Sequence, residues 1–239
     1  MTRQNSAASL LSRAGRLTLD LLYPPRCALC HKGGVFLCDR CREDLPKADG
    51  PRCRVCWLPS NDRFCPACDS HPLALDALRS PFRYDAGART LVHELKFRNF
   101  SALAEAMAGP MAVVATDRAV TADFIVPVPL SGRHERQRGY NQAGLLAHEI
   151  GRLVGIDVVE VLRRPHAAQP QSLTPDAAAR RKNVEGAFIL RPGASIEGHA
   201  ILLVDDVATT GATLDACARA LRLGGAKSIA AVTFAREDA

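Results

Sequence analysis

Two adjacent acids and a hydroxyl-rich turn follow four aliphatic residues in the stretch ILLVDDVATTGATL, residues 201–214. The aliphatic run predicts a buried strand, and ligands of open parallel α/β sheets bind at the carboxyl ends of the strands. We therefore expect Asp205 and Asp206 to point into a ligand site. The turn that follows would open a helix, where free backbone N–H groups and hydroxyls suit a phosphate group. Gly211 lets the backbone approach that anion closely.

This pattern fits a phosphorylated sugar. Two carboxylates can accept hydrogen bonds from the vicinal hydroxyls of a ribose, while the turn holds the ribose 5-phosphate. The alternative is that both acids only cap the next helix, where acids are favoured in any case. A cap needs one acid, however, and does not explain the threonines.

Eight of the nine cysteines occur as four C-x2-C pairs. Two such pairs supply the four sulfurs of a tetrahedral Zn²⁺ site. The gaps of 7, 11 and 8 residues between the pairs suggest two consecutive ribbons, although interleaved pairing is also compatible. The expected ligands are Cys27, Cys30, Cys38 and Cys41 for the first ribbon and Cys53, Cys56, Cys65 and Cys68 for the second.

Structural zinc is favoured over the other chemistries of clustered cysteines. Disulfides would require a secreted chain, and nothing in this sequence directs export. An iron–sulfur cluster is a weaker rival, because thiolate ligands alone do not decide between the metals. A closed four-thiolate site serves to fold a segment that has too little core of its own. His31 and His71 flank the pairs and could substitute as ligands, and the lone Cys217 is expected to be a small buried hydrophobe.

Composition indicates a globular chain of 239 residues, with 47% hydrophobic and 23% charged residues. This length suits one α/β domain and a small accessory module. The net charge is +6, and residues 1–80 hold 12 basic against 8 acidic residues. That bias favours contact with polyanions only weakly. No apolar run reaches 18 residues, so we expect no membrane span and a cytoplasmic protein.

Apolar periodicity predicts an α/β domain after the cysteine-rich region. The predicted helices span residues 9–22, 87–98, 101–115 and 140–155, and the predicted strands span residues 77–84, 123–129, 157–164, 186–190, 199–206 and 228–235. Aliphatic strands without polar alternation are buried on both faces, which indicates a largely parallel sheet with helices on each side. We expect an N-terminal amphipathic helix within 1–25, a double zinc ribbon over 26–72 and the α/β domain over 77–239.

Residues 201–213 resemble the phosphoribosyl pyrophosphate (PRPP) motif of the type I phosphoribosyltransferases. The segments LKFRN (95–99), PVPLSGRHERQRGYNQA (127–143) and QPQSLTPDAAARRKNVEGAF (169–188) are similar to signatures of the ComF family. The members of that family are double-zinc-ribbon, phosphoribosyltransferase-like proteins linked to bacterial DNA uptake. The resemblance covers nearly the whole chain and implies the type I phosphoribosyltransferase fold.

The resemblance also implies roles for individual residues. Asp205 and Asp206 would bind the ribose hydroxyls and act in catalysis with Arg180, which lies in a closing loop between residues 165 and 183. The 5-phosphate would be bound by Ala208, Thr209, Thr210, Gly211, Ala212 and Thr213. The pyrophosphate, with Mg²⁺, would be bound by Leu130, Ser131, Gly132, Arg133 and Arg138, with Arg136 nearby. Lys96 matches a signature position, but the sequence does not show whether it contacts ligand or supports the fold.

Three classes of function follow from these patterns, and PRPP binding in one domain can coexist with DNA binding in the other. The chain could transfer phosphoribosyl from PRPP to an unidentified acceptor, or sense PRPP without turnover. It could also bind single-stranded DNA and other DNA-uptake proteins through its basic ribbons. The aromatic residues Phe36, Trp57 and Phe64 would then stack on bases, or would equally form the core of the ribbons.

Overall fold

The structure is a computed structural model that describes residues 24–97, 102–117, 120–130, 132–165 and 187–238. The predicted helix over residues 9–22 lies outside these residues. The chain forms two compact units, Met1–Asp44 and Leu45–Ala239. The first ribbon belongs to the first unit, and the second ribbon belongs to the same unit as the α/β domain.

The two ribbons repeat the same backbone pattern about 26 residues apart. His31 N–H donates to the Cys27 carbonyl at 2.8 Å, and Trp57 N–H donates to the Cys53 carbonyl at 3.1 Å. Both His31 and Trp57 adopt positive φ, 61° and 64°. Each ribbon ends in a short helix that begins after its third cysteine, α2 (Asp39–Glu43) in the first and α3 (Pro66–Ser70) in the second. The ribbons are therefore tandem copies of one structural unit.

A parallel sheet forms the centre of the second unit, with strand order β1-β7-β6-β3. Its strands are β1 (Ala77–Arg79), β2 (Phe82–Arg83), β3 (Phe124–Pro127), β6 (Ala200–Ala208) and β7 (Ser228–Arg236). β1 and β2 both pair with β7, so the predicted edge strand is present but is interrupted between Arg79 and Phe82. β6 and β7 are buried over most of their length, as their aliphatic runs predict.

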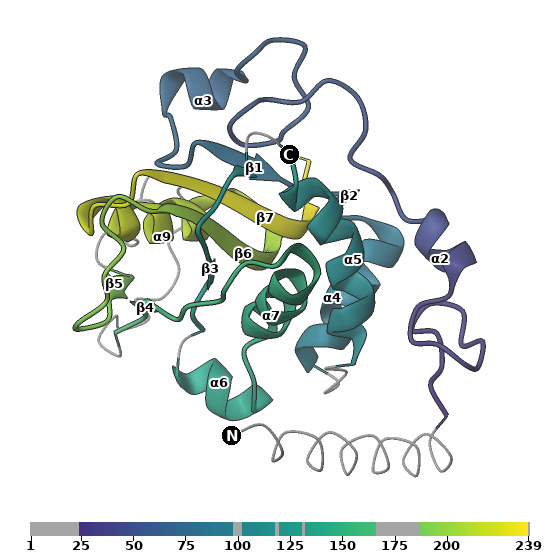
Figure 1. Ribbon diagram of the computed structural model, residues 1–239. Coiled ribbons are helices and arrows are strands. Elements are labelled where there is room, and N and C mark those ends of the chain that lie inside the picture. Colours follow the sequence, from purple (N-terminus) through teal and green to yellow (C-terminus); the bar gives the residue numbers. More distant parts are fainter. Residues whose placement is uncertain (1–23, 98–101, 118–119, 131, 166–186, 239) are drawn as a thin grey trace. The chain divides into compact units, whose positions relative to one another are not determined.

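Helices cover both faces of this sheet, which confirms the predicted fold class (Figure 1). One face packs against α4 (Ala86–Phe97), α5 (Leu103–Ala115) and α7 (Gln142–Val154), and the other packs against α9 (Ala212–Leu223). In α4, the buried Leu91, Val92 and Leu95 recur at helical spacing. α9 buries Leu214, Cys217 and Leu221 in the same way, so Cys217 is the small buried hydrophobe that was expected.

Two of the predicted strands are largely absent from the main sheet, so the prediction was wrong for them. Only β4 (Leu162–Arg163) and β5 (Ile189–Leu190) form, and they pair with each other in an antiparallel ribbon. From the segment before β4, Val158 makes a single parallel bridge to Ile125 of β3. The polar residues Asp157 and Glu160 break the aliphatic run there, which explains why pairing with the sheet is not sustained.

β6 continues past the two acids to Ala208, whereas the sequence predicted that it would end at Asp206. Its pairing with β3 ends at Val204, and residues 205–208 pair only with β7. The chain leaves β3 towards the bridge at Val158, while β6 connects through α9 to β7 in the opposite direction. The carboxyl ends of β3 and β6 therefore form the topological switch point, where ligands of such sheets bind.

Candidate functional site

Asp206 forms a buried ion pair at this switch point. Its Oδ1 lies 2.9 Å from Nζ of Lys96, which is in the last turn of α4. The Asp206 side chain is 3% exposed and that of Lys96 is 23% exposed. The second oxygen of Asp206, Oδ2, is buried without a hydrogen-bond partner. A buried carboxylate with one unsatisfied oxygen is suited to accept a hydrogen bond from a ligand.

Asp205 lies on the opposite face of β6, because successive side chains of a strand alternate. Ile201 and Leu203 share a core cluster with Leu214 of α9, which places Asp205 on the α9 side. Its Oδ1 accepts a hydrogen bond from Asp206 N–H at 2.8 Å. Burial and the neighbouring Asp206 carboxylate raise the pKa of Asp205 to about 8, although Lys96 and Arg138 act in the opposite direction.

Several side chains from the end of α6 (Gly132–Arg138) to the start of α7 fix the elements that surround these acids. They are Arg138, Tyr140, Asn141 and Gln142. The Tyr140 hydroxyl donates to the Leu95 carbonyl and so fixes the end of α4 that carries Lys96. Asn141 caps α7 by accepting from Ala143 N–H, and its Nδ2 donates to the Val128 carbonyl at 3.1 Å. Arg138 Nη1 donates to Gln142 Oε1 at 3.0 Å. Sequence reasoning missed these supporting roles, although the asparagine immediately before an apolar helical pattern is a cap signal.

The turn after β6 has the conformation that a phosphate site requires. Gly211 is the N-cap residue of α9, with φ of 80°, which favours glycine. Thr209, Thr210 and Thr213 are exposed, so their hydroxyls are accessible. Thr210 Oγ1 accepts from Ala212 N–H at 3.3 Å. The helix N-terminus and its positive partial charge thus face the exposed threonines.

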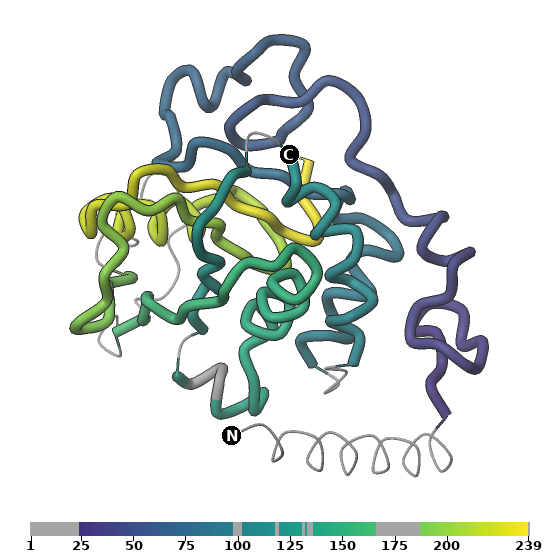
Figure 2. Tube along the Cα trace, in the orientation of Figure 1, coloured from purple at the N-terminus to yellow at the C-terminus, as the bar shows by residue number. Residues whose placement is uncertain are grey.

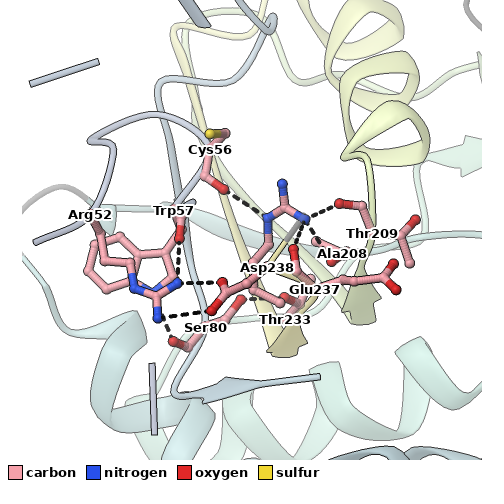
Figure 3. A network of polar contacts seen from close by, with 10 residues as sticks. Arg52, Cys56, Trp57, Ser80, Ala208, Thr209, Thr233, Glu237 and Asp238 are labelled. Carbon is pink, nitrogen blue, oxygen red and sulfur yellow. Dashed lines mark hydrogen bonds and ion pairs between the residues drawn. The ribbon is translucent and has the colours of Figure 1, made fainter. Parts of the chain in front are cut away.

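Arg236, the last residue of β7, lies directly behind this turn. Its side chain is almost fully buried, and Nη1 donates to the carbonyls of Ala208 and Thr209, the former at 3.0 Å (Figure 3). Its Nε donates to the Cys56 carbonyl of the second ribbon at 3.0 Å. No sequence motif indicated this residue.

Each ribbon gathers its four cysteines as the consecutive pairing predicts. All four sulfurs of each set lie within 4.8 Å of one another. The Sγ atoms of Cys30 and Cys38 are 3.7 Å apart, and those of Cys56 and Cys65 are 3.4 Å apart. A tetrahedral ion with Zn–S bonds of about 2.3 Å places sulfurs roughly 3.8 Å apart, so both sets fit zinc.

The thiols of each ribbon differ in pKa, because burial raises the pKa of Cys56 to about 11 and also raises those of Cys41 and Cys68. Burial would raise the pKa of Cys27, but backbone N–H groups of Cys30, Cys38 and Leu29 lower it to about 6, and the pKa of Cys53 is lowered likewise. Each ribbon therefore holds one thiol that readily becomes the thiolate a metal needs. Neither His31 nor His71 belongs to the ligand clusters of the described residues.

Comparison with known proteins gives a family match for each part of the chain. A family model of the double zinc ribbon domain matches residues 18–69, and one of the phosphoribosyl transferase domain matches residues 136–239. The DNA utilization protein YhgH of Escherichia coli K12 is 30% identical over 87% of this chain and 96% of its own length. The competence protein ComFC of Bacillus subtilis is 30% identical over 84% of each chain. The chain belongs to the ComF family. The competence protein F of Haemophilus influenzae is 28% identical over 88% of this chain and 96% of its own.

This ComF-family protein thus has the predicted combination of a double zinc ribbon and a type I phosphoribosyltransferase fold. In the described part of the chain, no helix has both the length and the apolar character needed to cross a bilayer.

Not all of the predicted site residues of this ComF-family protein can be placed. Ser131 and Arg180 lie outside the described residues, as does the predicted closing loop from residue 166 onward. Gly132 begins α6 (Gly132–Arg138), so the segment predicted to bind pyrophosphate is helical rather than a loop from this residue on. The side chain of Arg133, in this helix, is also outside the described part. Leu130 precedes the helix and is half-buried.

Proposed function

We propose that the α/β domain binds PRPP with Mg²⁺ and transfers its phosphoribosyl group to an acceptor, in a process of DNA uptake or utilization. The fold, the family and the names of the relatives support this proposal. The observation that carries it is the buried Asp206 of β6, whose unsatisfied oxygen lies at the switch point, five residues before Gly211.

The ion pair with Lys96 explains why Asp206 suits ribose hydroxyls. The Lys96 ammonium lies 2.9 Å from Oδ1 of Asp206, and hydrogen bonds to carboxylate oxygens are stronger than those to neutral acceptors. The free oxygen can accept from one hydroxyl of the ribose. The turn over residues 208–213 then receives the 5-phosphate at the N-terminus of α9, because both groups project from the same sugar.

Arginine side chains and Mg²⁺ would neutralise the negative charge of the pyrophosphate leaving group. In the transfer, the bond between the anomeric carbon and the pyrophosphate oxygen breaks with its electron pair on the oxygen, and the acceptor forms a new bond to the carbon. Mg²⁺ supplies positive charge to the departing pyrophosphate. Arg138, whose Nη1 donates to Gln142 Oε1 at 3.0 Å, would add to that charge.

Calorimetry with PRPP and Mg²⁺ tests the proposal. We expect wild type to bind, and the Asp206→Asn variant to lose at least about tenfold in affinity, because an amide is a weaker acceptor and loses the ion pair. Asp123→Asn is the matched control. Asp123 accepts from Ala200 N–H at 2.8 Å at the opposite end of β6, so its affinity for PRPP should be unchanged.

Absence of PRPP binding by zinc-loaded wild type would refute the proposal. Binding without pyrophosphate release, over a panel of amine and nucleobase acceptors, would instead favour the function of a PRPP sensor. These two outcomes separate the binding step of the proposal from the transfer step.

A second candidate function is binding of single-stranded nucleic acid by the second ribbon. Phe64 is 40% exposed, and the Arg63 guanidinium lies 5.2 Å from its ring centroid. Both line a hollow of the second unit that also includes Arg54. Trp57, in contrast, has its ring covered by Arg79 at 4.4 Å and its Nε1 bonded to the Ser80 carbonyl, so it does not act as a stacking platform.

Anisotropy of a labelled oligonucleotide tests this second function. Phe64→Ala should weaken binding by roughly 1–3 kcal/mol if a base stacks there. Affinity should also fall steeply with salt, because phosphate contacts release counterions. An unchanged affinity in Phe64→Ala would exclude this surface.

A further inference from the structure

The second ribbon is joined to the sheet of the α/β domain by several polar contacts. Leu78 N–H of β1 donates to the Val55 carbonyl at 2.7 Å, and Trp57 Nε1 donates to the Ser80 carbonyl at 2.9 Å. Arg52 forms an ion pair of 2.6 Å with Asp238. The ribbon therefore lies next to β1 and to the end of β7, although it precedes β7 by more than 150 residues in the sequence (Figure 2).

One of these contacts reaches the predicted phosphate turn. Arg236 donates from Nε to the Cys56 carbonyl and from Nη1 to the carbonyls of Ala208 and Thr209 (Figure 3). A single guanidinium thus connects a zinc-ligating cysteine residue to the two residues that begin the turn. Its planar, delocalised fork holds these acceptors in fixed directions, which a flexible lysine ammonium cannot do.

The planarity of the peptide bond gives this contact a consequence for the ligand side. The Ala208 carbonyl shares a rigid plane with Thr209 N–H, and the Thr209 carbonyl shares one with Thr210 N–H. In a trans peptide the two groups point in opposite directions. Glu237 N–H also donates to the Ala208 carbonyl at 2.9 Å, whereas Arg236 is the donor to the Thr209 carbonyl. Arg236 therefore helps to orient the N–H groups of Thr209 and Thr210 away from the core, towards the position proposed for the phosphate.

The zinc site determines where the third acceptor lies. Cys53 and Cys56 belong to one knuckle, in which Trp57 N–H bonds back to the Cys53 carbonyl at 3.1 Å and Trp57 has positive φ. All four sulfurs of this set are buried. Zinc bound there fixes the knuckle, and with it the Cys56 carbonyl that holds Arg236.

We infer that Arg236 is a positioning residue through which the second zinc ribbon, and not the first, sets the conformation of the phosphate turn. The inference rests on the proposed function only for the identity of the ligand. The first ribbon provides an internal comparison, since Cys30 occupies in it the place that Cys56 has in the second.

Hydrogen exchange of the full-length, zinc-loaded protein tests the inference without any ligand. We expect the Ala212 amide, which donates to Thr210 Oγ1 within the turn, to exchange about tenfold faster or more in Arg236→Lys, because the lysine cannot hold three carbonyls. Cys56→Ser should have the same effect. Cys30→Ser should leave the exchange of this turn within about twofold of wild type.

Asp238→Asn is the control for a merely structural effect. It weakens the ion pair that joins the ribbon to the segment after β7, and within the described residues the hydrogen bonds of the Asp238 side chain are to Arg52. It should lower the melting temperature without changing exchange of the Ala212 amide. If Arg236→Lys also loosens the core of β7, then Cys56→Ser, which leaves the guanidinium in place, decides the test.

Ligand binding supplies the second readout, with the only tryptophan, Trp57, as reporter. PRPP with Mg²⁺ should change Trp57 emission in wild type, because the turn, Arg236 and Cys56 connect the ligand to this residue. In Arg236→Lys, this change in Trp57 emission should be absent, and the affinity for PRPP should be about tenfold lower. Unchanged turn exchange in both Arg236→Lys and Cys56→Ser would overturn the inference, as would an equal effect of Cys30→Ser.

The two readouts separate this inference from the proposed function. If wild type fails to bind PRPP but the turn still loosens in Arg236→Lys, the proposed function fails and the inference stands. If PRPP binds equally to wild type and to Arg236→Lys with unchanged exchange, the inference fails and the proposed function stands.

Discussion

Lys96 and Asp206 should be strongly coupled in their effect on the stability of the second unit. Removal of one partner of a fully buried pair costs about 3–5 kcal/mol, because the other charge stays buried and unpaired. Since Lys96 is 23% exposed, water can partly replace it, and we expect Lys96→Met to cost about 2–3 kcal/mol. In the double variant with Asp206→Asn the buried charge is gone, so the two effects should fall short of additivity by about 1.5–2.5 kcal/mol.

A double-mutant cycle measures this coupling energy from urea unfolding of the zinc-loaded protein, followed by Trp57 emission. The matched control is the pair Arg152–Glu149, which has a similar distance of 3.0 Å but side chains 60% and 32% exposed. A pair of that kind within one helix contributes about 0.3–0.5 kcal/mol. If the coupling of Lys96 with Asp206 were no larger than that of the control pair, the reasoning from burial would be refuted.

Three further changes test other parts of the site. Gly211→Ala should lower the free energy of unfolding by about 1 kcal/mol and weaken PRPP binding, because alanine disfavours φ of 80°. As a control, Gly109→Ala in the interior of α5, where there is open space for the methyl group, should stabilise the protein by roughly 0.5–1 kcal/mol. Asn141→Ala should lower the stability measured by urea unfolding by about 1–2 kcal/mol, since α7 loses its cap and the Val128 carbonyl loses its donor. Finally, the raised pKa of Asp205 means that the folded protein keeps a proton which the unfolded chain releases near pH 3.8. The contribution of Asp205 to stability therefore falls as pH rises from about 4 to about 8. Unfolding at pH 5 and pH 8 should show a smaller decrease in Asp205→Asn than in wild type, and an equal decrease would contradict the assigned pKa.

The zinc ribbons and the phosphate turn could be predicted from the sequence because local spacing determines them. A C-x2-C turn brings two sulfurs together whatever the rest of the chain does. Similarly, an aliphatic run followed by acids, threonines and Gly211 specifies a strand, a turn and a helix start within fourteen residues. The structure confirms both local patterns, and the roles of the individual residues in ligand binding stay predictions.

The contacts that fix Asp206 and the phosphate turn could not be predicted, because they join residues that are far apart in the sequence. Lys96 meets Asp206, and Arg236 meets Cys56, only after the sheet and the second ribbon have assembled. The end of β6 was misplaced for a related reason. Asp205 and Asp206 are poor strand formers, yet pairing with β7 as far as Ala208 keeps them in the strand. The same tertiary control explains β4 and β5, whose short apolar runs pair with each other.

The two ribbons share a backbone pattern but differ in how many of their side chains contact the α/β domain. In the second copy, Arg52 and Trp57 are committed to Asp238 and Ser80 of the α/β unit, so mutations there must preserve an existing fit. The corresponding residues of the first copy, Arg26 and His31, are exposed. The second ribbon is thus a fixed part of the α/β unit, whereas the exposed positions of the first ribbon can be respecified. We expect the first ribbon to tolerate grafted sequences between its cysteines that would unfold the second.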